Sequence, residues 1–177
     1  MHGIDAKIVL FFQSIRCEAL TQLFYVFIPF EFWVLTAVIL VLCVLFRTKK
    51  LLAPVVSFVI AWSLSEYCYE ALKHLVRRPR PFFTIKGAVP LITPHGFSFP
   101  SGHATLAMAM AVVLSYYFPK ARYPIYVLAV LVGLSRVYFG VHYLSDVLAG
   151  FILGGLLGVL SIFLERAILS VAKKDTN

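Results

Sequence analysis

The chain has 177 residues, of which 61% are hydrophobic and 14% are charged, and its sixteen lysines and arginines outnumber eight acidic residues to give a net charge of +8. A soluble domain is about half apolar and about a quarter charged, so this composition argues against a soluble globular domain, a disordered chain and a soluble nucleic-acid-binding protein. The class that remains is an all-α, polytopic membrane helix bundle.

The N-terminal segment, residues 4–15, predicts a short amphipathic helix that lies at the membrane interface, because its apolar side chains recur at helical spacing. It is too short to cross a bilayer. The segment also lacks the basic start, the uninterrupted apolar core and the cleavage site of a signal peptide, so we expect no cleavage here.

About five transmembrane helices are expected to follow, each long enough for the hydrocarbon core. The first is one long or proline-broken helix from Leu20 to Phe46, whose second half crosses the hydrocarbon, and the others cover residues 51–76, 102–118, 123–139 and 144–168. The prolines of the RRPRPF stretch end the second span, since proline removes a donor and disfavours helical geometry in its predecessor. With no repeat and no linker visible, residues 1–177 are expected to form a single membrane-embedded domain.

The last span carries Gly150, Gly154 and Gly158 at intervals of four residues. This spacing is the small-xxx-small pattern that lets two helices approach closely, so it predicts a packing role.

Basic residues predict the orientation. They concentrate at 47–50, at 120–122 and at 166–174, and all three clusters fall on one side if the N-terminus is outside. By the positive-inside rule that side is the cytoplasm. Residues 73–100 and the 139–144 connection would then face the periplasm or exterior, in a protein of the cell inner (cytoplasmic) membrane.

Three motifs with ionisable residues lie at this outer end: KHLVRRPRP at 73–81, PSGH at 100–103 and SRVYFGVHYLSD at 135–146. Ionisable residues near the membrane are costly and indicate function. Phosphoryl transfer needs positive charge around three equatorial oxygens, an in-line nucleophile and a proton for the leaving oxygen. The three motifs contain residues of all these types.

Five of these residues are expected to bind a phosphate. Lys73, Arg80 and Arg136 supply three cations, two of them planar guanidinium forks. Ser101 can cap the helix that it begins, and with Gly102 it can present backbone N–H groups to an anion.

Two histidines are assigned catalytic roles. Asp146 follows His142 by about one helical turn, so its carboxylate could keep one ring nitrogen protonated and leave the other free to attack phosphorus. His103 would be the general acid that protonates the leaving oxygen and the base that later activates water. Because the ligand set is cationic, no metal and no other cofactor is expected.

The three motifs resemble those of the type 2 phosphatidic acid phosphatase superfamily, which shares its site with the vanadium haloperoxidases. The family pattern is a Lys, six residues and Arg-Pro; then Pro-Ser-Gly-His; then Ser-Arg, five residues, His, three residues and Asp. All eleven defining residues are present here in that order. The resemblance implies a small bacterial-type membrane lipid phosphatase that forms a phosphohistidine on His142.

The substrate follows from the position of the site rather than from the motifs. A site at the membrane face with short loops favours a lipid phosphate or diphosphate over a soluble sugar phosphate. Undecaprenyl diphosphate, phosphatidylglycerophosphate, phosphatidic acid and lipid A are substrates among relatives, and the motifs, which recognise only the phosphate, do not choose among them. The oligomeric state is left open.

Two other classes of protein stay open. A membrane transporter or channel with a charged extracytoplasmic vestibule would distribute its charges across the membrane depth. A catalytically idle lipid-binding protein would lack a motif histidine or aspartate, and none is lost here.

The remaining ionisable residues are expected to have structural or incidental roles. Arg77, Arg78 and Lys86 would extend toward lipid head groups, and His95 is an incidental loop residue with a small chance of touching substrate. Glu66 and Glu70 would pair with Lys73 rather than contact substrate.

Overall fold

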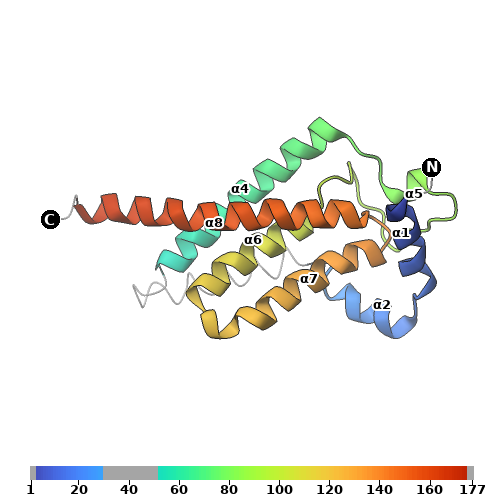
Figure 1. The fold of residues 1–177 in the computed structure, drawn as a ribbon, viewed down its shortest axis with the longest axis horizontal. Coiled ribbons are helices and arrows are strands. Elements are labelled where there is room, and N and C mark those ends of the chain that lie inside the picture. The colour runs from blue at the N-terminus through green and yellow to red at the C-terminus, as the bar shows by residue number, and fades with distance from the viewer. Residues whose placement is uncertain (1–2, 30–51, 175–177) are drawn as a thin grey trace.

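The computed structural model describes residues 3–29 and 52–174, and these residues form helices and connecting turns without a β-strand (Figure 1). The elements are α1 (Ile4–Ser14), α2 (Glu18–Tyr25), α4 (Leu52–Val76), α5 (Pro81–Thr84), α6 (Gly102–Tyr117), the 3₁₀ helix η2 (Pro119–Ala121), α7 (Arg122–Tyr138) and α8 (Leu144–Lys174). The all-α prediction is confirmed for the described residues. Helices α4, α6 and α7 match their predicted ranges within a residue or two, whereas α8 continues six residues beyond the predicted end.

Helix α6 lies at the centre of the bundle and packs against α4, α7 and α8 (Figure 1). Leu106 and Val113 are completely buried, and small side chains such as Ala104 and Ala109 alternate with them. Small residues bring helix backbones close together, so three neighbours fit around this one short helix.

The glycines of α8 face the main chain of α6. A Cβ atom on Gly154 would collide with the carbonyl oxygen of Thr105, and one on Gly158 would lie 2.8 Å from that of Ala109. Gly150 sits at the same face, one turn nearer the start of α8. The predicted packing role of this pattern is therefore confirmed.

Two segments of the described chain are long and apolar enough to cross a membrane, Leu52–Thr84 and Leu144–Val171, with mean hydropathies of 1.3 and 2.5. Helix α6 is apolar but shorter, at sixteen residues. The second half of the first predicted span and the basic cluster at 47–50 lie outside the described residues. The count of five spans therefore stays a prediction.

The N-terminal helices pack at the end of the bundle where α7 ends and α8 begins (Figure 1). The helix predicted over residues 4–15 is present as α1, and its Ala6 and Val9 are buried in a cluster with Val137 and Val147. Helix α2 ends at Tyr25, before Pro29, which agrees with the proline-broken form of the predicted first span.

The chain bends sharply after α4 and continues to α5 (Figure 1). Helix α4 ends at Val76, and Arg77 adopts a left-handed conformation with φ of 52°. Pro79 and Pro81 then prevent a helical continuation, as predicted, and Pro81 begins α5, where its missing N–H costs nothing. After this turn, Arg78 contacts the start of α8 and Arg80 contacts the connection between α7 and α8.

Candidate active site

His142 lies in the connection between α7 and α8 and is only 5% exposed. Its Nδ1 atom lies 2.7 Å from the carbonyl oxygen of Ser98 and 3.6 Å from Oδ2 of Asp146. Both neighbours can only accept a hydrogen bond, so Nδ1 carries the proton. The other ring nitrogen, Nε2, lies 3.3 Å from Nη1 of Arg80 and keeps its lone pair. Such an imidazole is suited to nucleophilic attack through Nε2.

The electrostatic surroundings keep His142 neutral. Burial lowers the pKa of His142, and the positive charge of Arg80 lowers it further, while the Asp146 carboxylate and the Ser98 carbonyl act in the opposite direction without cancelling these effects. The neutral imidazole is the form in which a histidine can be a nucleophile.

Asp146 lies in the first turn of α8 and is completely buried. Its Oδ2 accepts a hydrogen bond of 2.9 Å from the backbone N–H of Tyr143, and its main-chain oxygen accepts one of 3.1 Å from the N–H of Ser101. The second and third sequence motifs are joined directly by this last bond. A carboxylate at this position is also favoured by the N-terminal end of the helix.

Arg80 is held rigidly beside His142 and is 4% exposed. Its guanidinium donates to three carbonyl oxygens, those of Gly96 at 3.0 Å, His95 at 2.9 Å and Val141 at 3.0 Å. The contribution of His95 is therefore made by its main chain, while its side chain is exposed. With so many fixed contacts, Arg80 presents its positive charge at one place next to the imidazole.

Lys73 and Gly102 both lie against the ring of Tyr69. The Lys73 ammonium lies 4.5 Å from the centroid of this ring and 2.7 Å from Oε1 of Glu70. A Cβ atom on Gly102 would lie 2.9 Å from the same ring, so a side chain at this position would displace Tyr69. The expected ion pair of Glu70 with Lys73 is present, whereas Glu66 accepts a hydrogen bond of 2.5 Å from the Tyr69 hydroxyl.

Ser101 stands at the N-cap position of α6, but its side chain makes no capping hydrogen bond. The prediction that its hydroxyl caps this helix is therefore wrong. Its Oγ atom is buried and finds no hydrogen-bond partner among the described residues. The Ser101 N–H donates to the main-chain oxygen of Asp146 and its C=O accepts from Thr105, so the residue is fixed through its backbone. A buried hydroxyl of this kind is a ready ligand for an oxyanion.

Arg136 and His103 both contact the turn that follows α2. Arg136 is 2% exposed and donates to the carbonyl oxygen of Phe27 at 2.5 Å and to Oγ of Ser135 at 3.0 Å. The imidazole of His103 hydrogen-bonds the main chain of Ile28, and the positive charges of Arg136 and Lys73 act on it. These contacts place the second histidine among the cations of the other motifs.

Arg78 is a further member of this site, and its predicted environment is wrong. It was expected to extend toward lipid head groups, but it forms an ion pair of 2.6 Å with Asp146 and one of 2.9 Å with Asp5 of α1. Burial alone would lower the pKa of Arg78, but the two carboxylates outweigh burial and raise it. No local pattern could indicate this partner, because Asp5 is 73 residues away along the chain.

Ser98 is a second residue of the site that the sequence motifs do not indicate. It is completely buried, its N–H donates to the carbonyl oxygen of Arg78 at 2.9 Å and its own carbonyl faces His142. Because the interaction uses the main chain, no side-chain type at this position could have indicated it.

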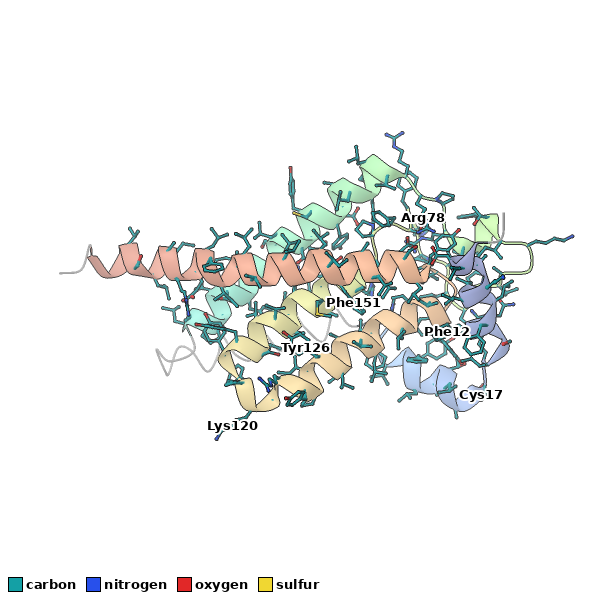
Figure 2. All side chains as sticks on the ribbon, viewed as in Figure 1. Phe12, Cys17, Arg78, Lys120, Tyr126 and Phe151 are labelled. Carbon is teal, nitrogen blue, oxygen red and sulfur yellow. The ribbon has the colours of Figure 1, made fainter. Side chains whose placement is uncertain are left out.

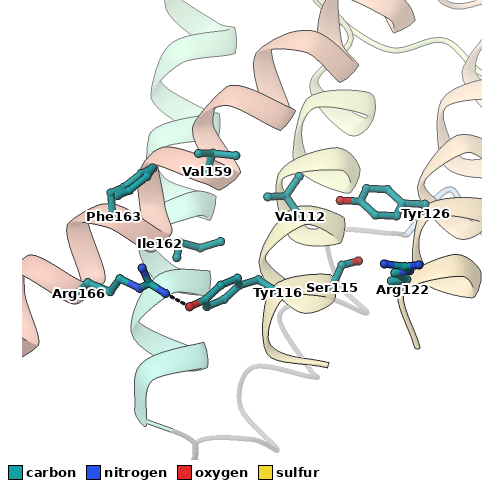
Figure 3. A pocket seen from close by; sticks show the side chains of 9 residues that line it. All are labelled: Val112, Ser115, Tyr116, Arg122, Tyr126, Val159, Ile162, Phe163 and Arg166. Atoms are coloured by element: carbon teal, nitrogen blue, oxygen red, sulfur yellow. Dashed lines mark hydrogen bonds between the residues drawn. The ribbon is translucent and has the colours of Figure 1, made fainter. Parts of the chain in front are cut away.

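Two cavities lie at opposite ends of the bundle. One, of about 600 Å³, is next to the site and is lined by residues that include Asp5, Arg78 and Tyr143. The other, of about 460 Å³, lies between α6, α7 and α8 near Tyr116 and Arg166, whose side chains are hydrogen-bonded (Figure 3). None of the motif residues lines this second cavity. Arg78 and Lys120 mark the same two ends of the molecule in Figure 2.

Within the described ranges, no group of three or more His, Cys, Asp or Glu side chains is arranged to hold a metal ion. The carboxylate of Asp146 is bonded to an arginine and to a backbone N–H, and the two histidines lie among cations. This donor set suits an anion rather than a metal.

The helical bundle thus gathers lysine, arginine and the two histidines of the three motifs at one end. The chain belongs to the PAP2 superfamily, whose family model matches residues 54–167. This range contains all three sequence motifs, so the expected family is confirmed.

Two curated relatives indicate the reactions found among similar proteins. Over 144 residues the chain is 38% identical to an undecaprenyl-diphosphatase of Sulfolobus acidocaldarius, and the match covers 80% of this chain and 64% of that protein. Over 99 residues it is 42% identical to phosphatidylglycerophosphatase B of Bacillus subtilis, covering 50% of this chain and 46% of the relative. The chain thus spans less than two thirds of the length of either relative.

Two solved structures share the fold. The PAP2-type phosphatidylglycerolphosphate phosphatase of Bacillus subtilis superposes with a TM-score of 0.78 at 29% identity, over 93% of this chain and 85% of that one. LpxE of Aquifex aeolicus superposes with a TM-score of 0.79 at 26% identity, over 90% of this chain and 95% of that one.

Proposed function

We propose that this chain is a metal-independent integral membrane phosphatase that hydrolyses a phosphate monoester or diphosphate of a membrane lipid. The observation that carries the proposal is the His142 imidazole: its Nδ1 faces two acceptors, and its Nε2 is unprotonated beside the Arg80 guanidinium. A neutral nucleophile next to a fixed cation is the arrangement that phosphoryl transfer requires.

In the first step, Nε2 of His142 attacks phosphorus, and the bond between phosphorus and the leaving oxygen breaks. His103 gives its proton to that oxygen, which leaves as an alcohol or as a lipid phosphate. Lys73, Arg80 and Arg136 stabilise the three equatorial oxygens, with the backbone N–H groups at the start of α6 and the buried Ser101 hydroxyl. The product is a phosphohistidine.

In the second step, a water molecule attacks the phosphohistidine. His103, now neutral, takes a proton from this water as the new P–O bond forms and the P–N bond breaks. Inorganic phosphate leaves and His142 returns to the neutral imidazole. The hydrogen bond from Nδ1 to the Ser98 carbonyl and the nearby Asp146 carboxylate stabilise the positive charge that the ring carries in the intermediate.

The substrate class is an amphiphile with a terminal phosphate. Named relatives of this chain act on undecaprenyl diphosphate, phosphatidylglycerophosphate or lipid A, which differ in their lipid part and share a phosphate at the membrane surface. A site at one end of an apolar bundle would receive such a phosphate by diffusion of the lipid within the membrane.

The proposed topology is a single domain with about five membrane spans and an outward-facing site in the cytoplasmic membrane. Two segments already meet the length and hydropathy of a span, and the three motifs meet at one end of the bundle. The basic residues Lys120, Arg122 and Arg166 lie toward the other end, where the positive-inside rule expects the cytoplasm.

A channel or transporter is less consistent with the charge distribution. In the described residues, the buried charged side chains Arg80, Arg136 and Asp146 belong to the site at one end, and Glu165 is a separate buried acid bonded to Tyr117. No continuous line of ionisable groups connects them along the described helices.

The test is phosphate release from a panel of lipid phosphates and diphosphates in detergent, with EDTA present throughout. We expect turnover of at least one lipid substrate, unaffected by EDTA and inhibited competitively by vanadate, which can adopt the trigonal bipyramid of the transition state. The absence of turnover on every member of the panel, by a protein that still unfolds cooperatively, would contradict the proposal. Loss of activity with EDTA that returns on adding a divalent metal would contradict its metal independence.

A further inference from the structure

We propose that Arg78 and Asp5 are positioning residues of the active site, which hold the Asp146 carboxylate in place and balance its charge so that it can act on His142. The inference rests on the proposed phosphatase function. Under this proposal α1, the N-terminal helix, contributes Asp5 to the active site in addition to its predicted role at the membrane interface.

The Asp146 carboxylate is oriented by Arg78. Its Oδ1 lies 2.6 Å from Nη1 of Arg78, and its Oδ2 accepts the N–H of Tyr143 and lies 3.6 Å from Nδ1 of His142. Because one oxygen is fixed by the arginine, the direction in which the other faces the imidazole is fixed as well. Asp146 is completely buried, so no solvent competes for these contacts.

Arg78 is in turn held on three sides. Its Nη2 lies 2.9 Å from Oδ2 of Asp5, its Nη1 donates to Oγ of Ser145 at 2.7 Å, and its guanidinium lies 3.8 Å above the centroid of the Tyr143 ring. A planar fork can serve two carboxylates and an aromatic face together, whereas the single ammonium of lysine cannot.

Asp5 completes the network from another helix. Its Oδ1 accepts the backbone N–H of Ser145 at 3.1 Å, and its Oδ2 accepts the Ser145 hydroxyl, so it also satisfies donors at the start of α8. Hydrogen bonds from Ser145 and Arg78 outweigh the effect of burial and lower the pKa of Asp5 below its ordinary value. Asp5 is therefore a carboxylate at neutral pH.

The charges in this network explain its effect on His142. Two carboxylates, Asp5 and Asp146, share one guanidinium, which leaves a net negative charge to face the imidazolium that forms during the reaction. Without Asp5, Arg78 would be balanced by Asp146 alone, and less negative charge would face His142. Without Arg78, Asp146 would be a buried anion with only backbone and histidine partners, which costs free energy and disturbs its position. Arg80 faces the opposite side of His142 and is not part of the network.

The network reaches from the buried nucleophile to a solvent-accessible cavity. Asp146 is inaccessible, whereas the side chains of Asp5 and Arg78 are 27% and 29% exposed and line the cavity of about 600 Å³. Figure 2 shows Arg78 at this end of the bundle, next to α1 and the start of α8. Substitution of Asp5 or Arg78 should therefore leave the packing of the buried helical core unchanged.

The experiment compares Asp5→Asn, Arg78→Gln, Arg78→Lys and the double variant Asp5→Asn/Arg78→Gln with two matched controls. Arg77→Gln removes the same charge from the adjacent exposed residue, and Glu18→Gln removes an acid from the exposed start of α2. For each protein kcat, KM, the inhibition constant of vanadate and the thermal midpoint are measured over a range of pH.

We expect Arg78→Gln and Asp5→Asn to lower kcat by about 10- to 100-fold, as is typical when the partner that orients a catalytic ligand is lost. KM and vanadate inhibition should change by less than about threefold, because the phosphate-binding residues are untouched. Arg78→Lys should retain more activity than Arg78→Gln, and the double variant should be close to Arg78→Gln alone, since both changes act through Asp146. The controls should behave as the wild type.

A measurement independent of turnover is the ¹⁵N and ¹H NMR signal of the His142 ring N–H. It should shift in Asp5→Asn and Arg78→Gln and stay unchanged in Arg77→Gln and Glu18→Gln. An unchanged ring signal, or additive effects of the two substitutions on kcat, would overturn the positioning role. If the wild type released no phosphate from any lipid, the phosphatase proposal would fail, while the NMR comparison would still decide whether the network acts on His142.

Discussion

The carbonyl oxygen of Ser98 lies 2.7 Å from Nδ1 of His142, closer than the carboxylate of Asp146 at 3.6 Å. The main chain thus fixes the tautomer of the proposed nucleophile, and Asp146 acts as a nearby charge rather than as the nearest hydrogen-bond acceptor. A carbonyl is held by the fold, so this contact survives changes of side chain around it.

The nucleophile is tested by His142→Ala. Without Nε2 no phosphohistidine can form, so phosphate release should fall by at least about 1000-fold. His74→Ala is the matched control, because His74 is exposed at the end of α4, and it should keep activity near that of the wild type. Retained turnover in a folded His142→Ala protein would remove His142 as the nucleophile.

Arg136→Lys tests whether the guanidinium fork matters at constant charge. Arg136 donates through Nη2 to Phe27 and through Nε to Ser135, and a lysine cannot keep both bonds while facing a phosphate. We expect kcat/KM to fall by about 10- to 100-fold, in line with the loss of one or two charge-assisted hydrogen bonds. Arg122→Lys at the other end of the bundle should have no effect, and near-normal activity of Arg136→Lys would argue against a forked contact.

The close packing of α8 on α6 is tested by two adjacent glycines. A Cβ on Gly154 would collide with the Thr105 carbonyl, whereas one on Gly155 meets only Cγ of Met108 at 4.0 Å. Gly154→Ala should therefore destabilise the fold by about 1–3 kcal/mol. Gly155→Ala should leave stability unchanged or raise it by up to about 1 kcal/mol, because alanine favours helix. Thermal unfolding in detergent measures both, and equal midpoints for the two variants would count against this packing.

The acid sensitivity of the Asp5 contact follows from its pKa. Asp5 has an ordinary value of 3.8, and although burial raises the pKa, the hydrogen bonds from Ser145 and Arg78 lower it further than burial raises it. A carboxyl group whose pKa is lower in the folded state stabilises the fold above its unfolded pKa, and this stabilisation is lost as the pH falls through the folded value. The difference in thermal midpoint between the wild type and Asp5→Asn should be full at neutral pH and shrink as the pH falls below the ordinary value of 3.8. A difference that stayed constant over this range would exclude the ionised pair as its cause.

The orientation is tested by single cysteines in a background where Cys17, Cys43 and Cys68 are replaced by serine. A cysteine at Lys86, which is exposed near the site, should react with an impermeant reagent on intact cells. A cysteine at Lys120, at the opposite end, should react only after the membrane is disrupted (Figure 2). The reverse pattern would invert the proposed topology.

Much of the site was predictable because its residues stand close together within each motif. The spacing of Lys73 and Arg80, and of Arg136, His142 and Asp146, is fixed along the chain, and alternating helices bring their ends to one face. The helix ranges followed from hydropathy and proline positions for the same reason, since both are local properties.

The two wrong predictions concern residues whose contacts come from distant parts of the chain. Ser101 was expected to cap α6 by its hydroxyl, yet its backbone is fixed by Asp146, 45 positions later, and its side chain makes no cap. Arg78 was expected to extend toward lipid head groups, as basic residues near helix ends usually do, but its partners come from α1 and α8.

The sequence by itself was enough to predict the all-α membrane class, the family and a set of candidate catalytic residues, because composition, hydropathy and motif spacing are local quantities. Only the tertiary structure decided that Ser98 faces His142, that Lys73 and Gly102 both lie against the Tyr69 ring, and that Asp5 reaches Asp146 through Arg78. These relationships depend on how helices far apart in the chain pack against one another, and that packing determines which hydrogen-bond donors and acceptors meet.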